Sequence, residues 1–223
     1  FSKELYNRVK EKNLNVDRLI NNAGFGYSGK FLDSTMENYD EMINLNIVSL
    51  VHLTHLFLKD MVKNKQGGII NISSLASFQP IPYFSIYAAT KAFVTSFTLS
   101  LYEEYRKKNI QVLGVCPGYT KTNFNKRAHV SDAPAVGYLM SSEQVVDQSL
   151  KAYSKGKFLI INGKINKLTK ILNNNINGSI IIDPKIHDSN DGSLNIYANL
   201  NVNGNLTSIN STVKDISCKT IIF

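Results

Sequence analysis

A tyrosine and a lysine stand four residues apart in the segment YAATK, as Tyr87 and Lys91. On a helix this spacing places both side chains on one face, one turn apart. A phenol has an ordinary pKa near 10 and is a weak base at neutral pH. Because a neighbouring ammonium favours the phenolate, we expect Lys91 to lower the pKa of Tyr87. The pair could then exchange a proton with a substrate oxygen as a general acid or base.

Two further polar residues, Asn46 and Ser74, precede this pair along the chain. Ser74 ends the segment NISS, which directly follows an apolar run. A hydroxyl at such a strand end can donate a hydrogen bond to a substrate carbonyl or alcohol oxygen and orient it. Tyr83 and Phe84 precede Tyr87 and could either shape a substrate pocket or simply pack. Each feature alone is common, and it is their order that favours a single catalytic site.

The elements that must position these residues alternate between strands and helices. Apolar runs predict strands at 17–23, 69–73, 110–116 and 157–161, and helical periodicity predicts helices at 2–12, 35–64, 84–108, 142–154 and 164–172. A break in the second helix is expected near Asn44. Strands that alternate with helices connect through right-handed crossovers into a parallel sheet. Strands that are apolar throughout agree with this fold, because helices cover both faces of such a sheet.

The chain changes character after residue 173. The Asn-rich segment 173–223 contains a stretch of alternating apolar and polar residues, which is typical of a half-exposed strand. Its Asp-Gly and Asn-Gly pairs are strong hairpin signals. A small antiparallel meander is therefore predicted, with strands near 179–186, 193–202, 205–213 and 216–222. The run NVNGNLTSINSTV weakly resembles the β-rich repeats of phage-type tail fibres.

Composition restricts the function classes. The formal net charge is +8, and the basic excess lies in residues 1–172. Such an excess could attract a phosphorylated cofactor, an acyl carrier or nucleic acid, but without a nucleic-acid-binding signature we expect a solvated lysine-rich surface. No apolar run approaches the ~18–20 residues of a membrane span, so none is expected. The chain has two cysteines, which is typical of a reduced, cytoplasmic protein. His52 and His55 have no third metal-binding residue at a suitable spacing, so no metal site is expected.

Taken together, the segments NNAG, NISS, FQP, YAATKAF and CPGYTKT resemble the short-chain dehydrogenase/reductase family over residues 1–172. The resemblance implies a Rossmann-like doubly wound parallel sheet and an oxidoreductase that interconverts an alcohol and a carbonyl with NADP or NAD. Family habit and the basic charge mildly favour NADP. Small-molecule alcohols or carbonyls are the implied substrates. A homo-dimer or tetramer formed through the helices at 35–64 and 84–108 is implied as well.

The resemblance also assigns site residues. The catalytic set is Asn46, Ser74, Tyr87 and Lys91, and the cofactor-binding set is Asn22, Ala23, Gly24, Tyr87, Lys91, Pro117, Gly118, Thr120 and Thr122. Asn46 would hold a water molecule that relays protons to Lys91, and Ser73 would have a supporting or packing role. Asn21 would tie strands together. Gly24 lacks a Cβ, so its backbone could pass close to a ring or ribose.

The chain departs from the family pattern at its start. The glycine-rich turn TGxxxGxG, which places backbone amides on a dinucleotide pyrophosphate, is absent. We therefore expect an N-terminally truncated, incomplete fold with an apolar sheet edge left uncovered, poorly stable and largely inactive by itself. The alternative to an enzyme is a non-catalytic structural or assembly protein that retains a dehydrogenase remnant, and nucleic-acid binding is a third reading.

Overall fold

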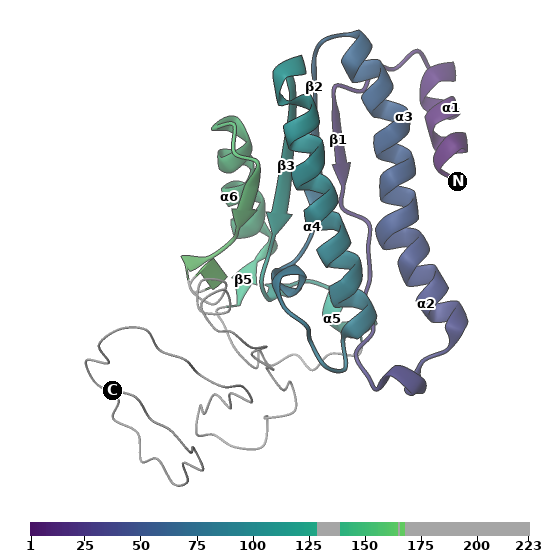
Figure 1. The fold of residues 1–223 in the computed structure, drawn as a ribbon, viewed down its shortest axis with the longest axis vertical. Helices are drawn as coiled ribbons and strands as arrows, with labels where there is room; N and C mark the ends of the chain where they lie inside the picture. The colour runs from purple at the N-terminus through teal and green to yellow at the C-terminus, as the bar shows by residue number, and fades with distance from the viewer. Residues whose placement is uncertain (129–138, 165, 168–223) are drawn as a thin grey trace, which may run out of the picture.

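The computed structural model describes residues 1–128, 139–164, 166 and 167. Four parallel strands form its main sheet in the order β1–β2–β3–β6 (Figure 1). Their bounds are Arg18–Asn21 for β1, Gly67–Ile72 for β2, Ile110–Cys116 for β3 and Leu159–Ile161 for β6. The predicted parallel α/β fold is confirmed, and each predicted strand has its counterpart in this sheet.

The long helices also follow the periodicity of the sequence. They are α1 (Ser2–Glu11), α2 (Met36–Ile43), α3 (Leu50–Lys63), α4 (Ser85–Tyr105) and α6 (Ser142–Ser154). A π-helical segment, η2 (Asn44–Ser49), joins α2 to α3, so the break expected near Asn44 is a local change of helix type. Helices α3 and α4 lie side by side over one face of the sheet (Figure 1).

The remaining elements are short. They are the 3₁₀ turns η1 (Phe31–Asp33), η3 (Leu75–Phe78) and η4 (Arg106–Lys108), the helix α5 (Phe124–Arg127), and a parallel pair of strands, β4 (Thr120–Lys121) and β5 (Met140–Ser141). The turn η4 is the end of the helix predicted at 84–108, and the others were not predicted because they are too short to show a period. The predicted meander within 173–223 lies outside the described residues, as does most of the helix predicted at 164–172.

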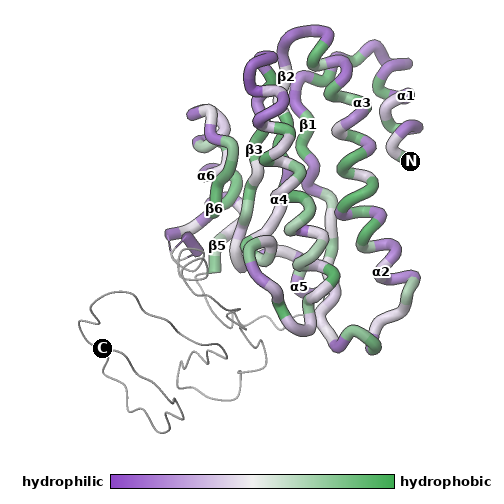
Figure 2. Tube along the Cα trace, viewed as in Figure 1, coloured by the Kyte–Doolittle hydropathy of each residue, from purple (hydrophilic) through white to green (hydrophobic). Residues whose placement is uncertain are grey.

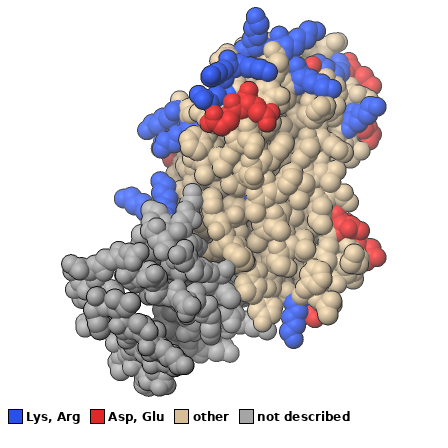
Figure 3. All heavy atoms as spheres, in the orientation of Figure 1, with Lys and Arg blue, Asp and Glu red and all other residues tan. Residues whose placement is uncertain are grey.

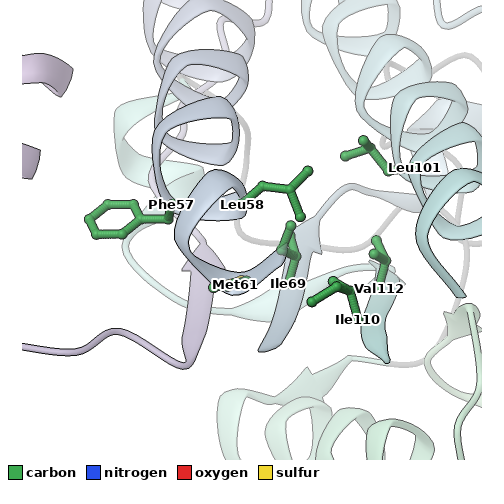
Figure 4. Close-up of a cluster of buried hydrophobic side chains, with 7 residues drawn as sticks. All are labelled: Phe57, Leu58, Met61, Ile69, Leu101, Ile110 and Val112. Atoms are coloured by element: carbon green, nitrogen blue, oxygen red, sulfur yellow. The ribbon is translucent and has the colours of Figure 1, made fainter. Parts of the chain in front are cut away.

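Successive residues of β2 pack on opposite sides of the sheet, as the pleat of a strand requires. Ile69 packs with Phe57, Leu58 and Met61 of α3 on one side, in a hydrophobic cluster that β3 and α4 complete (Figure 4). Ile70 packs with Ala152 of α6 on the other side. Helices thus cover both faces, which explains why the strands are apolar throughout (Figure 2).

A short ladder of polar side chains crosses the interior of the sheet. Asn21 donates hydrogen bonds to Asn71 Oδ1 at 2.8 Å and to Thr54 Oγ1 at 3.0 Å. Asn71 in turn donates to Thr98 Oγ1 of α4 at 2.9 Å. The prediction that Asn21 ties strands together is confirmed, since the ladder joins β1 to β2 and the sheet to two helices.

Strand β1 is the edge of the described sheet, and its Ile20 is 57% exposed. This agrees with the expected uncovered apolar edge. The helical stretch Met36–Lys63 contains an 18-residue window of mean hydropathy 1.3, so it is long and apolar enough to cross a membrane by length and composition alone. The stretch contains no uninterrupted apolar run of ~18–20 residues, and Leu58 and Met61 show that its inner face packs on the sheet. The absence of a membrane span stays a prediction.

Charge gathers at one end of the molecule. In Figure 3, Lys and Arg side chains collect over the end where α3 and α4 finish, and the middle of the same face is uncharged. The parallel α/β arrangement brings these helix C-termini together, and a helix C-terminus favours cations. The carboxyl ends of the strands lie at the opposite end (Figure 1).

We predict that Asn71→Ala lowers the free energy of unfolding by about 2–4 kcal/mol, because it leaves buried partners without hydrogen bonds and opens a cavity. Asn71 is 0% exposed. Urea denaturation measures the change. Asn64→Ala is the matched control, since Asn64 is exposed, and it should change stability by less than about 0.5 kcal/mol. An equal loss of unfolding free energy in both variants would show that the ladder does not contribute specially to stability.

Candidate active site

A cavity of about 780 Å³ opens at the carboxyl ends of the strands. Its size is typical of small-molecule and cofactor sites. The predicted residues that line it are Asn22, Gly24, Ser74, Tyr87, Lys91, Pro117, Gly118, Thr120 and Thr122. Ala23 and Asn46 are absent from its lining. Residues from four separate segments, namely those after β1, β2 and β3 and helix α4, therefore meet in one space.

Tyr87 and Lys91 lie one turn apart on α4 and are 7% and 5% exposed. The Lys91 Nζ donates a hydrogen bond to the carbonyl oxygen of Ile72, the last residue of β2, at 2.9 Å. The same nitrogen lies 5.7 Å from the centroid of the Tyr87 ring. The end of β2 therefore fixes the ammonium beside the phenol.

Burial changes the pKa of both residues. It raises the pKa of Tyr87 to about 12, and a hydrogen bond with Ser74 opposes this rise. Burial also lowers the pKa of Lys91 to about 8, against a smaller opposing effect of Cys116. The net shift of the Tyr87 pKa is opposite to the expected one, because burial disfavours the phenolate and Ser74, not Lys91, is the group that lowers the pKa. At neutral pH Tyr87 therefore keeps its proton.

The two serines of NISS have different surroundings. Ser73 is buried, and its hydroxyl donates to the Lys91 carbonyl at 2.8 Å and bonds with Thr95 Oγ1 at 2.6 Å. Ser74 lines the cavity, and its oxygen accepts a hydrogen bond from the Ala76 amide at 3.1 Å. This geometry agrees with a packing role for Ser73 and leaves Ser74 facing Tyr87.

Asn46 lies behind the cavity in the π-helical segment, where its side chain makes three hydrogen bonds. It accepts from the Phe25 amide at 3.1 Å, and it donates to the Phe25 carbonyl at 2.9 Å and to Thr90 Oγ1 at 3.1 Å. The side chain therefore joins the loop after β1 to helix α4. Its role in holding a water molecule stays a prediction.

The NNAG segment lies next to this junction. A Cβ on Gly24 would lie 2.9 Å from Asn46 Oδ1 and 3.4 Å from Lys91 Nζ. A larger residue at position 24 would therefore crowd Asn46 and Lys91 even with no ligand bound. Asn22 is exposed and faces the cavity, whereas Ala23 is exposed outside its lining.

The CPGYTKT segment forms the opposite side of the cavity. Pro117 and Gly118 follow the end of β3, and a Cβ on Gly118 would collide with the amide of Asn166. Thr120 Oγ1 donates to the Gly118 carbonyl at 3.0 Å, and Thr122 Oγ1 accepts from the Phe124 amide at 3.2 Å. These contacts hold the segment in place across the cavity from Gly24.

Aromatic side chains form the wall beside Tyr87. The rings of Phe84 and Phe124 lie 4.5 and 5.2 Å from the Tyr87 ring, measured between centroids. A Cβ on Gly26 would lie 3.0 Å from all three rings. Sequence reasoning left the role of Phe84 open and missed Gly26 and Phe124, because no local pattern shows that they approach Tyr87.

The site contains groups suited to a nicotinamide dinucleotide. Backbone at Gly24 and Gly118, the Lys91 ammonium and the hydroxyls of Thr120 and Thr122 are placed along one cavity of sufficient size. Among the residues that the structure describes, no three His, Cys, Asp or Glu side chains are grouped to hold a metal ion.

Comparison with known proteins points to one family. A family model described as short chain dehydrogenase matches residues 2–132. The human very-long-chain 3-oxoacyl-CoA reductase is 38% identical over 141 residues, which are 60% of this chain and 45% of the relative. Oxidoreductase UcpA of Salmonella typhimurium is 38% identical over 116 residues, 52% of this chain and 44% of the relative. The chain thus spans less than half of the length of these relatives.

Solved structures show the same architecture. A short-chain dehydrogenase from Sphingobium yanoikuyae, in complex with NADPH, superposes with a TM-score of 0.68 and is 29% identical, covering 78% of this chain and 67% of its own. A bulky-bulky ketone specific alcohol dehydrogenase from Comamonas testosteroni gives a TM-score of 0.63 at 27% identity, covering 78% and 65%.

We predict that Lys91 makes stability depend on pH between about 8 and 10. Its folded pKa of about 8 lies below its ordinary value of 10.5, so the unfolded chain binds more protons in this window and stability rises with pH. Relative to Lys91→Met, the wild type should gain about 2 kcal/mol from pH 7.5 to 10. Above pH 10 the raised pKa of Tyr87 acts in the opposite sense, because the unfolded tyrosine loses its proton first.

Chemical denaturation at each pH measures this difference. Lys107→Met is the matched control, because Lys107 is exposed at the other end of the molecule. It should show the same pH dependence as the wild type. A parallel pH dependence in the wild type and Lys91→Met would mean that the ammonium is not buried.

Proposed function

Because the chain belongs to the short-chain dehydrogenase family, we propose that the protein interconverts an alcohol and a carbonyl by hydride transfer with NADP(H) or NAD(H). One observation carries the proposal: Ser74, Tyr87 and Lys91 line one cavity, where Ser74 lies near enough to Tyr87 to oppose the rise of its pKa. The nicotinamide ring, when bound, supplies or accepts the hydride.

Each residue of the chain has a defined part in the proposed reaction. Ser74 binds the substrate oxygen, and Tyr87 exchanges a proton with it. Burial raises the pKa of Tyr87 to about 12, so its protonated phenol can donate a proton to a carbonyl oxygen when the reaction runs as a reduction. The printed name of the human relative, a 3-oxoacyl-CoA reductase, supports the same direction.

The cofactor would lie between the NNAG and CPGYTKT segments. Lys91 is the cation in this region and would bind the ribose, and Thr120 and Thr122 would bind the carboxamide. The Sphingobium yanoikuyae dehydrogenase was solved with NADPH, and this supports NADP(H) over NAD(H).

The uncharged face over α3 and α4 supports self-association into a dimer or tetramer (Figure 3). Phe93 of α4 is 39% exposed and stacks on Phe97 at 5.8 Å between ring centroids. Burial of such a surface against a second copy would remove apolar area from water.

The alternative function, a structural protein that retains a dehydrogenase remnant, has less support. Burial disfavours the charged forms of both Lys91 and Tyr87, as their shifted pKa values show, and this lowers the stability of the fold. A non-catalytic remnant would gain nothing from this cost. Groups held at such a cost are typical of functional sites.

We predict that Tyr87→Phe lowers turnover about 10²- to 10⁴-fold, the range expected when a general acid is removed. Oxidation of the reduced cofactor, followed by its absorbance with a panel of ketones in the full-length protein, measures turnover. Cofactor affinity should change little. Tyr105→Phe is the matched control, because Tyr105 lies at the far end of α4. Full turnover by Tyr87→Phe would refute the proposed function.

A further inference from the structure

Arg127 is a cation on the wall of the cavity that the proposed mechanism does not use. It is the last residue of α5, and its Cζ lies 4.5 Å from the centroid of the Phe25 ring. Phe25 is 5% exposed. A guanidinium over an aromatic face is held there by the negative charge of the ring face, so Phe25 gives the Arg127 charge a defined place.

The Phe25 ring is itself fixed relative to Tyr87. Both hydrogen-bonding groups of the Phe25 backbone are bound by Asn46, which is also bonded to α4 at Thr90. Phe25 and Tyr87 belong to the same buried hydrophobic cluster. The Arg127 guanidinium is therefore supported by the same parts of the fold that support the proposed proton donor.

Helix α5 places Arg127 on the aromatic side of the cavity. Phe124, one turn earlier on α5, has its ring 5.2 Å from the Tyr87 ring, and residues one turn apart share a helix face. Together, Phe84 and Phe124 form an apolar wall that continues from Tyr87 toward Arg127. This wall adjoins the segments assigned to the cofactor, since Phe25 follows Gly24 and the Phe124 amide donates to Thr122 Oγ1.

The charge of Arg127 is not balanced by the described part of the chain. The other arginines, Arg8, Arg18 and Arg106, each form an ion pair with a carboxylate at 2.7–2.8 Å. Within the described ranges no carboxylate lies within ion-pair distance of Arg127, and no Asp or Glu lines the cavity. Lys91, the other cation of the cavity, is bound to the Ile72 carbonyl.

We propose that Arg127 binds an oxyanion of the substrate, so that the preferred substrate is an anionic oxo or hydroxy compound whose apolar part packs against Phe84 and Phe124. The inference rests on the proposed function and assigns its substrate class. The planar guanidinium can donate two parallel hydrogen bonds to a carboxylate or a phosphate ester. A neutral ketone of the same shape would not make this contact, and the exposed guanidinium would stay hydrated.

The test compares matched substrates in the full-length protein: an oxo acid with an apolar chain, its methyl ester, and a phosphate ester of a similar ketone. The wild type should prefer the charged compounds. Arg127→Gln should lower kcat/KM for them about 10- to 100-fold, the size expected for a charged hydrogen bond, and leave the methyl ester within about twofold. Arg127→Lys should be intermediate, because it keeps the charge and loses the paired donors.

Lys126→Gln is the matched control, because Lys126 is exposed on the same helix, carries the same charge and does not line the cavity. It should leave all values unchanged. Whichever charged compound loses more in Arg127→Gln identifies the anion. Equal losses for acid and ester, or a raised KM for NADPH in place of the substrate, would overturn the inference.

A binding measurement separates this inference from the proposed function. Calorimetric titration measures the affinity of the oxo acid and of its ester for Tyr87→Phe, with and without Arg127→Gln. The difference between the two affinities reports the contact with the anion in the absence of turnover. Absence of cofactor oxidation by the wild type with every ketone would refute the proposed function alone. Equal affinity of Tyr87→Phe for acid and ester would refute the role of Arg127.

Discussion

The buried amide of Asn46 holds together the two segments on which the candidate site depends. Its hydrogen bonds bind the Phe25 backbone on one side and Thr90 of α4 on the other. Loss of such a partner leaves buried polar groups unsatisfied, at about 1–3 kcal/mol each. The π-helical segment delivers Asn46 to this place, and Gly24 leaves room for it, since a Cβ there would meet its oxygen at 2.9 Å. The loop at Phe25, the π-helical segment and Gly24 thus depend on one another through the Asn46 side chain.

The site is built at a cost in stability. Lys91 and Tyr87 are buried where the charged form of each is disfavoured, and their surroundings compensate only in part through the Ile72 carbonyl and Ser74. The polar ladder of Asn21, Asn71 and their threonine partners, by contrast, is fully bonded. The same interior therefore contains polar groups that stabilise the sheet and polar groups held ready for chemistry, and hydrogen-bond satisfaction distinguishes them.

The two sides of the cavity have different chemical characters. The side made by strand ends and the segments after them offers backbone groups, threonine hydroxyls and the Lys91 ammonium, which suit a polar cofactor. The side made by α5 and the loop before α4 offers aromatic rings and a guanidinium. This division separates the groups of the proposed hydride-transfer site from the features proposed to select a substrate, and under that proposal substrate choice could change without change at Tyr87.

The amino-acid sequence by itself determined the parallel sheet, the long helices and the order of Ser74, Tyr87 and Lys91, because hydrophobic period and a one-turn spacing are local properties of the chain. Only the tertiary structure decided the direction of the Tyr87 pKa shift, since that direction depends on burial by distant segments. It also brought Phe25, Phe124 and Arg127 to the cavity. Contacts between residues far apart in the sequence, and elements as short as α5, leave no periodic signal from which they could be predicted.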